Sequence, residues 1–397
     1  MKLAPIRADL LQVGAPIPFD VYNSTGRLLL RRGHVLENEY QLGRLLEGGR
    51  YDADGVEAAS SRSHAPSGRV VQEFSRLPSQ LARNRVSIFD RLTDVAHALE
   101  DAVSLAAPTP EFESTIRPTA ASIRECCALD SDAALAHIMI AAVHRYSLRH
   151  TTNVAILTSL LLSRSNHDPA KAESTIAAAL TMNLSILDLQ DTLVRQQEPL
   201  TPEQRSSLRL HAAESTKVLR SYGIQDAIWL DAVEQHHEAR DGTGYPGGLK
   251  EPAISREAQI VSVADRYCSL VSQRTYRPAL SPRRAIKELH ERAGSAIEPG
   301  LIGALIATVG LFPPGAYVRL ANGETAIVVR RLLDPKHPVV YALHQDTTAP
   351  YESPKKRLTA SNRDYEIVSD VKPEAVRVKI IPDQLWPPSA VGEPPPA

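Results

Sequence analysis

Two adjacent histidines, His236 and His237, are the residues of this sequence best suited to metal chemistry. Neighbouring side chains on a helix project about 100° apart, so the pair can line two sides of one pocket. His211 lies one helix and a return earlier in the chain, which brings it opposite the pair. Three imidazoles with an open coordination position can hold a divalent ion that activates water.

The spacing therefore predicts a site for one ion of iron, manganese or zinc, all of which accept imidazole ligands. His150, in the helical run 150–162, and Asp265, in the run 260–270, are further candidate ligands. The alternative is structural, because thirteen histidines in 397 residues also produce clusters by chance. Glu238 follows the pair and is expected to accept hydrogen bonds from the neighbouring histidines.

Helices are expected to position these side chains. The run Thr201–Gln204 has the residues of a capping box with proline in the first turn, and it predicts a helix start. Ser255 and Ser281 predict two more starts, and residues 226–238 can form a further helix. Leu208, His211 and Ser215 fall on one helical face. The pattern over about 70–310 indicates a bundle of several helices.

Both ends of the chain differ from this helical part. Residues 16–22 and 27–31 predict two strands around a turn, and residues 37–46 have helical spacing. After residue 313, the runs 317–320, 325–330 and 339–343 predict short strands. The expected organisation is an N-terminal α+β module (1–57), a linker (58–69), connecting helices (70–134), a helical domain (135–312), a β-rich tail (313–385) and a disordered, Pro-rich end (386–397).

Composition limits the class of protein. A length of 397 residues predicts two or three domains, and a net charge of −1 argues against a surface that coats nucleic-acid polymers. The three cysteines, two of them adjacent, are typical of a reducing compartment. The first residues lack the apolar core of a signal peptide, and the longest apolar stretch, 301–312, is too short to span a bilayer. A cytoplasmic protein without a membrane span is expected.

Several motifs together resemble the HD-GYP family. Residues 236–249 read HHEARDGTGYPGGL, which is similar to the signature of that family. Residues 144–161, 200–211 and 260–278 resemble its other motifs, in the same order. The resemblance covers about 135–345. It implies a mainly α protein: an HD-GYP-like helical bundle with a small N-terminal α+β module and a short C-terminal β-tail.

The resemblance also implies bacterial cyclic-di-GMP signalling, with two or three metal ions that activate water to hydrolyse cyclic-di-GMP. Carried over one residue at a time, His150 and Asp265 match ligands of a first metal site. His211, His236 and His237 match ligands of a second.

The His-Asp pair of the family is missing. Met182 stands at the His position and Asn183 at the Asp position. Asparagine cannot supply the negative charge that would bridge two metals, and methionine sulfur is a soft ligand. Ser185 and Ile186 replace a glycine and a phosphate-facing lysine. Since losing one general acid or base costs about 10²–10⁴-fold in rate, weak or absent phosphodiesterase activity is expected, with no intact catalytic pair.

Two further changes lie near the expected site. Tyr146 occupies a position where three-metal members have glutamate, and Cys268 stands where the family often has aspartate.

Two segments are candidates for nucleotide binding. Arg274, Tyr276 and Arg277 combine guanidinium groups that suit phosphate oxygens with a ring that can stack on guanine. The loop Gly244-Tyr245-Pro246 is expected to present an aromatic tip. In the family this loop is implicated in the substrate pocket and in contacts with partner proteins, including GGDEF-type proteins. Three functions remain open: a degenerate nucleotide- or partner-binding protein, a phosphodiesterase with a reduced metal site, and an adaptor that binds neither nucleotide nor metal.

Overall fold

The computed structural model divides the chain into two units, Met1–Arg76 and Leu77–Ala397. In the first unit it describes residues 3–6, 10–11, 17–22, 28–30, 32–33 and 50–52. In the second it describes 85–104, 111–141, 145–164, 168–275, 277–345, 350–376 and 378–390.

The N-terminal unit contains a four-stranded antiparallel sheet of order β1-β4-β2-β3. The strands are β1 (Leu3–Pro5), β2 (Val21–Tyr22), β3 (Leu28–Leu30) and β4 (Arg50–Asp52). Phe19 is buried and its ring stacks on Tyr51, with centroids 4.7 Å apart. The two predicted strands are thus confirmed as a pair, β2 with β3. The helix expected at 37–46 and the linker at 58–69 lie outside the described residues.

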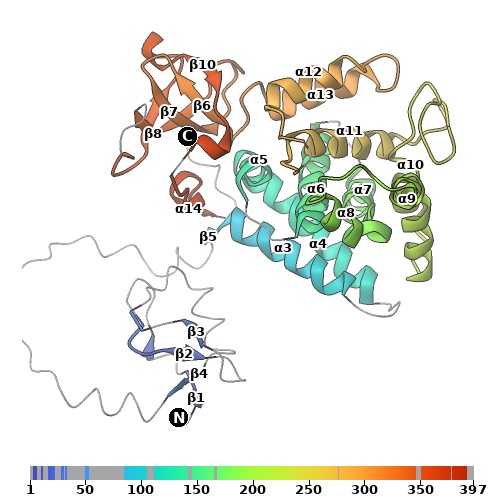
Figure 1. Ribbon diagram of the computed structural model, residues 1–397, viewed down its shortest axis with the longest axis horizontal. Helices are drawn as coiled ribbons and strands as arrows, with labels where there is room; N and C mark the ends of the chain where they lie inside the picture. The colour runs from blue at the N-terminus through green and yellow to red at the C-terminus, as the bar shows by residue number, and fades with distance from the viewer. Residues whose placement is uncertain are drawn as a thin grey trace, which may run out of the picture. The chain divides into compact units, whose positions relative to one another are not determined.

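A helical bundle forms most of the second unit (Figure 1). Its helices are α3 (Ile88–Val103), α4 (Glu111–Leu129), α5 (Ser131–Ile140), α6 (Tyr146–Arg164), α7 (Pro169–Thr181), the 3₁₀ helix η3 (Leu184–Ile186), α8 (Leu187–Leu193), α9 (Pro202–Ser221), α10 (Ala227–Gln235), α11 (Arg256–Val271), α12 (Pro282–His290) and α13 (Pro299–Val309). Helix α6 is central, because it is buried on every side from Thr151 to Leu162 and packs against α4, α7 and α11. The predicted mainly α fold is confirmed.

The predicted helix starts are confirmed by their caps. The Thr201 hydroxyl accepts from the Gln204 N–H at 3.2 Å, and the Gln204 side chain accepts from the Thr201 N–H at 3.0 Å. Ser255 caps α11 by accepting from the Ala258 N–H, and Ser281 is the N-cap residue of α12. These caps fix the starts of α9 and α11, which carry His211 and Asp265.

Residues 177–189 do not form one helix. Helix α7 ends at Thr181, and the chain passes through η3 before α8 begins. The Ser185 hydroxyl donates to the His211 carbonyl at 3.0 Å and lies 3.0 Å from the Ser215 hydroxyl. Side-chain hydrogen bonds of this kind compete with helical ones. The break therefore ties the end of α7 to the helix that carries His211.

A five-stranded antiparallel sheet of order β10-β6-β7-β8-β9 follows the bundle (Figure 1). The strands are β6 (Tyr317–Leu320), β7 (Glu324–Arg330), β8 (Val339–Gln345), β9 (Lys355–Leu358) and β10 (Ile367–Asp370). The three predicted strands are confirmed as β6, β7 and β8. Arg330, at the end of β7, forms an ion pair with the buried Asp130, the N-cap of α5, with Nη1 and Oδ1 2.5 Å apart.

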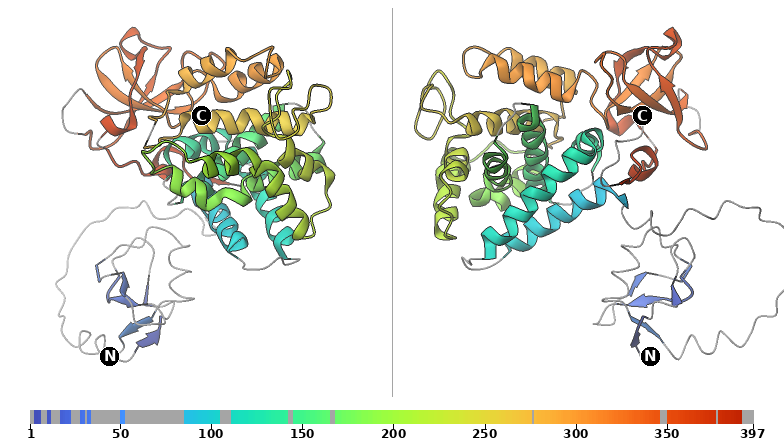
Figure 2. Two further views of the ribbon diagram at one scale, coloured as in Figure 1. Left: turned by 45° about the vertical axis from the view of Figure 1, so that its right-hand side comes forward. Right: turned by 180° about the vertical axis from the view of Figure 1, so that it is seen from behind.

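The chain is ordered further toward its end than expected. After α14 (Pro382–Leu385), the Trp386 indole is buried and donates to the Val329 carbonyl at 3.0 Å. Strand β11 (Ser389–Ala390) then pairs with β5 (Arg85–Val86), just before α3 (Figure 2). The prediction that the chain is disordered from residue 386 is therefore wrong for residues 386–390. The Trp386 indole is held there by apolar contacts and by a hydrogen-bond acceptor.

The three cysteines, Cys126, Cys127 and Cys268, are buried and free. Among the residues that the structure describes, none of the helices combines the length and apolar character needed to cross a bilayer.

Buried His137 in α5 predicts a loss of stability in acid. Its side chain is 1% exposed, and burial lowers its pKa to about 4, an effect that nearby Asn153 only partly offsets. Between pH 6.5 and 4 the unfolded chain binds more protons at this residue than the folded chain, so the free energy of unfolding falls as pH falls. Between pH 7 and pH 5, the free energy of unfolding should fall by about 2 kcal/mol more in the wild-type protein than in His137→Leu. Chemical denaturation at the two pH values measures this difference.

Exposed His290 provides the control for this experiment. The His290→Gln variant should keep the acid-induced loss of the wild-type protein. Equal slopes of stability against pH in the wild-type protein and His137→Leu would contradict the prediction.

Candidate metal centre

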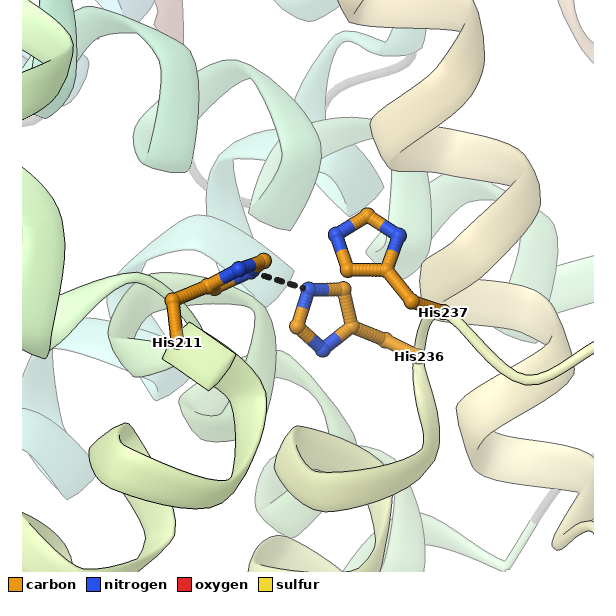
Figure 3. A group of neighbouring side chains, drawn as sticks. All are labelled: His211, His236 and His237. Carbon is orange, nitrogen blue, oxygen red and sulfur yellow. Dashed lines mark hydrogen bonds between the residues drawn. The ribbon is translucent and has the colours of Figure 1, made fainter. Parts of the chain in front are cut away.

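Three histidines meet at the junction of two helices. His211 lies in the middle of α9, and His236 and His237 directly follow the last turn of α10. Figure 3 shows His211 approaching from one side and the adjacent pair from the other. The candidate ligand atoms of the three lie within 4.8 Å of one another, and both His211 and His236 are buried. The structure thus brings together the three histidines that the sequence predicted.

The hydrogen bonds of two rings fix their tautomers. Nδ1 of His211 lies 2.7 Å from the Leu208 carbonyl, and Nδ1 of His236 lies 2.6 Å from the Val233 carbonyl. A carbonyl only accepts, so each Nδ1 carries the proton and each Nε2 presents a lone pair. These lone pairs face each other, since the two Nε2 atoms are 3.2 Å apart (Figure 3).

A divalent ion fits this arrangement. Two neutral imidazoles cannot share a hydrogen bond between two lone pairs. Two nitrogens bound to one tetrahedral ion at about 2.0–2.1 Å are about 3.3 Å apart, close to the observed separation. The backbone carbonyls on the Nδ1 side orient both rings, as the outer partners of metal-binding histidines do. Among the described residues, this is the one group of three such side chains close enough to hold an ion.

Burial keeps the three imidazoles neutral, which is the form that binds metal. It lowers the pKa of His211, lowers that of His236 to about 4, and lowers that of His237 well below its usual value. Arg266, which follows Asp265 on α11, adds to the effect at His236 and His237 through its positive charge. Arg266 was not among the residues predicted from the sequence, although its adjacency to Asp265 was a usable signal.

His150 and Asp265 form a separate pair. The His150 Nε2 atom lies 2.7 Å from Asp265 Oδ1, and the two side chains are 2% and 13% exposed. Burial raises the pKa of Asp265, but the hydrogen bond and charge of His150 outweigh this effect and leave the pKa well below the usual range. The carboxylate is therefore ionised and bonded to His150, outside the group formed by the three histidines.

The two residues predicted to stand in place of the family's His-Asp pair are buried. Met182 is 0% exposed and belongs to the hydrophobic core of the bundle, and Asn183 is also buried. The Tyr146 ring stacks on His150, with centroids 5.7 Å apart and planes 11° apart. Met182 and Asn183 therefore offer no imidazole or carboxylate ligand at these two positions.

The loop after the histidines folds back over them. Tyr245 stacks on His237 at 4.7 Å and is half-buried, so the expected aromatic tip points inward, while Pro246 is exposed. Glu238 accepts from the N–H groups of Gly247 at 2.6 Å and Leu249 at 2.8 Å. The expected support of the histidines by Glu238 is wrong: its carboxylate holds the loop instead.

Gly244 permits this close return of the loop. A Cβ there would lie 2.4 Å from the Ala239 nitrogen and 2.5 Å from the Glu238 Cα, both backbone atoms. We expect Gly244→Ala to push Tyr245 off His237, to lower the free energy of unfolding by about 1–3 kcal/mol and to weaken metal binding. Denaturation and a metal titration measure the two effects.

Gly303 in α13 offers a matched control, since a Cβ there meets nothing within 4 Å. Gly303→Ala should leave metal binding unchanged and stabilise the helix slightly. A Gly244→Ala protein with unchanged metal affinity would show that the loop does not brace the histidines.

The predicted nucleotide-binding arginines differ in their surroundings. The Arg274 Nη2 donates to the Tyr146 hydroxyl at 2.7 Å and to the Ser269 hydroxyl at 2.8 Å, and its guanidinium lies 5.4 Å from the centre of the Tyr146 ring. Arg277 donates to the Ser269 carbonyl at 2.6 Å. Tyr276 lies outside the described residues. Arg274 is thus placed beside the Tyr146–His150 stack, whereas Arg277 is bonded to the end of α11.

The part of the chain that contains these histidines is similar in sequence to known proteins. The family model of the HD domain matches residues 136–301. The cyclic di-GMP phosphodiesterase PA4108 of Pseudomonas aeruginosa is 27% identical over 226 residues, which cover 56% of this chain and 54% of the relative. The cyclic di-GMP phosphodiesterase response regulator RpfG of Xanthomonas campestris pv. campestris is 42% identical over 132 residues, 32% of this chain and 34% of the relative.

A third relative acts on another nucleotide. The 3′3′-cGAMP-specific phosphodiesterase 3 of Vibrio cholerae is 28% identical over 169 residues, 42% of this chain and 36% of the relative. The match thus spans about half the length, or less, of these curated relatives.

The fold also has a counterpart among solved structures. Bd1817, an HD-GYP protein from Bdellovibrio bacteriovorus, aligns with a TM-score of 0.51 over 77% of this chain and 98% of that chain, at 19% identity. Together with the family match and the motif order, this similarity confirms the predicted resemblance. Residues 136–301 of the chain therefore match the HD domain family, and this part of the chain is similar to HD-GYP proteins.

Proposed function

We propose that the protein binds cyclic-di-GMP at a site that holds one divalent ion, and that its phosphodiesterase activity is impaired. One observation carries the proposal: the three histidines lie close together with converging lone pairs, while Met182 and Asn183 stand where the resemblance implies a histidine and the bridging aspartate. The names of the relatives support the ligand class, since cyclic dinucleotides are their substrates.

Each residue has a defined task in this proposal. His211, His236 and His237 hold the ion, which when bound supplies positive charge and a means to activate water. Asp265 keeps His150 oriented through their hydrogen bond. Arg266 is half-buried and makes no ion pair within 4 Å among the described residues, so its charge is available to a phosphate near the histidines. Arg274 contributes a second positive charge beside Tyr146.

A working phosphodiesterase with a reduced metal site is the second candidate. It is favoured by the presence of His150 and Asp265, which are hydrogen-bonded to each other and little exposed. Asp265 is also close enough to the histidine group to interact electrostatically with His236 and His237. The exposed residues Pro246, Gly247 and Gly248 of the loop offer a contact for protein partners, including GGDEF-type proteins. The three buried free cysteines favour a cytoplasmic location.

Turnover and binding of cyclic-di-GMP by the purified protein test the proposal. We expect little or no turnover with manganese or ferrous iron, together with binding that calorimetry detects. Turnover that is lost in a His236→Ala, His237→Ala double variant would instead establish the active enzyme. Absence of both turnover and binding would establish the adaptor.

Arg274→Ala should weaken cyclic-di-GMP binding about tenfold or more, because a hydrogen bond to a charged group contributes about 1.5–3 kcal/mol. Calorimetry measures the dissociation constant of cyclic-di-GMP for this variant and for the control Arg205→Ala, which changes an exposed residue. An unchanged dissociation constant would remove Arg274 from the nucleotide site.

A further inference from the structure

One side of helix α9 leaves an apolar side chain in solvent. The helix packs against α10 and η3 and lies at the edge of the bundle (Figure 1). Leu210, in its middle, is 48% exposed. An open hollow of about 770 Å³ lies beside this leucine, and the residues that line it include Ser185, Ile186, Ser207, Glu214 and Val218. A single exposed leucine is ordinary, so what covers it must be argued from its surroundings.

The exposed side of α9 carries an ordered set of side chains. At 3.6 residues per turn, five residues fall within about 40° of the line through Leu210 along the helix. These residues, which we call the α9 stripe, are Glu203, Ser206, Leu210, Glu214 and Lys217. Four of them are exposed, and Glu214 is partly exposed. The stripe therefore faces away from the side of α9 that is buried in the bundle.

The order of charges along the α9 stripe is complementary to itself. Glu203 precedes Leu210 by seven residues, and Lys217 follows it by seven. Two antiparallel copies of α9 that cross at Leu210 therefore place Glu203 of each copy opposite Lys217 of the other. Ser206 and Glu214 lie four residues on either side of Leu210, so the same crossing lets the hydroxyl donate to the carboxylate. A parallel pair would instead place the Glu203 side chains together.

The dimensions of the helix permit these contacts. Glu203 and Lys217 are each about 10 Å along the axis from Leu210, so helices that cross at about 20° keep both residues within reach of the other copy. Lys217 donates to Glu214 of its own chain at 2.7 Å. An ammonium group has three donors, so Lys217 can bond to this carboxylate and to Glu203 of a second copy at the same time.

We infer that the α9 stripe is the contact between two copies of this chain, related by a two-fold axis that passes between their Leu210 side chains. Such a contact is isologous, because the same surface serves both copies. Leu210 of each copy then fills the hollow of the other, near Ile186. Ser185, which lines the hollow, donates to the His211 carbonyl at 3.0 Å, so the contact adjoins the helix that carries a candidate metal ligand.

Sedimentation equilibrium of the full chain, without nucleotide, tests this contact. Because one pair of helices makes a smaller interface than a typical stable complex, we expect a monomer–dimer equilibrium with a dissociation constant of about 10–100 µM. Leu210→Glu should be monomeric throughout this range. Leu358→Glu, which changes a leucine of the β-tail that is 46% exposed, should dimerise like the wild-type protein.

An exchange of charges tests the antiparallel arrangement. Lys217→Glu should weaken the dimer about tenfold or more, because each two-fold-related pair would then join two carboxylates. The double variant Glu203→Lys, Lys217→Glu should restore the wild-type dissociation constant. Arg205→Glu is the control, since it makes the same change of charge at an exposed position about 140° around α9 from Leu210.

Three results would overturn the inference: a wild-type protein that stays monomeric, a dimer that survives Leu210→Glu, or a double variant as weak as Lys217→Glu. All the substituted positions are exposed, so the variants should keep the circular dichroism spectrum of the wild-type protein. If Leu210→Glu does not keep it, the exchange of charges decides alone. Neither metal nor nucleotide enters these measurements, so their outcome is independent of the proposed function.

Discussion

His236→Ala is expected to lower the metal content of the purified protein from about one equivalent per chain to nearly none. In the proposed site, the imidazole that it removes would share the ion with His211, whose Nε2 atom lies 3.2 Å away. Loss of an outer hydrogen-bond partner of a metal ligand costs about 10–100-fold in affinity, so loss of the ligand itself should cost at least about 100-fold. Elemental analysis and competition with a chelating dye measure the content and the affinity.

Two further variants sharpen this experiment. Exposed His290→Ala should keep the full metal content. His150→Ala should also keep it, because His150 bonds to Asp265 rather than to the three-histidine group. A loss of metal in His150→Ala as large as in His236→Ala would contradict a site of three histidines and indicate a shared centre.

Restoring the His-Asp pair, through Met182→His and Asn183→Asp together, is expected to raise the metal content from one ion to two. It should also raise cyclic-di-GMP turnover by about 100-fold or more, the effect of a single well-placed catalytic group. The side chains at both positions are already buried beside the helices that carry the candidate ligands. The added carboxylate would supply the negative charge that two neighbouring ions require, next to the pair of His150 and Asp265.

The same double substitution in a His236→Ala background serves as the control and should gain no turnover. A correctly folded double variant with one ion and unchanged turnover would show that other departures limit the site. Tyr146, whose ring covers His150, and Ile186, in the place of the phosphate-facing lysine, would then be the residues to replace.

Local signals in the sequence predicted the elements that carry the site. The capping box at Thr201 and the cap at Ser255 depend on residues within one turn, so the starts of α9 and α11 follow from the sequence. The grouping of His211 with His236 and His237 also follows, because a helix and a short return fix where the histidines can meet.

The features that the sequence did not predict depend on contacts between parts of the chain that are far apart in sequence. No glycine or proline marks the break after α7; the hydrogen bonds of Ser185 with Ser215 and the His211 carbonyl come from another helix. Glu238 adjoins the histidines in sequence, yet α10 ends at Gln235 and the returning loop offers it two N–H groups.

The short pairing of β11 with β5 brings together two segments that lie far apart in the sequence of the second unit. Because Ser389–Ala390 pair with Arg85–Val86, the first and last described strands of this unit lie side by side. Neighbouring ends of this kind tolerate circular permutation. A permutant that joins residue 390 to residue 85 and opens the chain in an exposed turn should keep its metal centre. A segment fused to either of these two strands would therefore be attached at the same place, next to the start of α3.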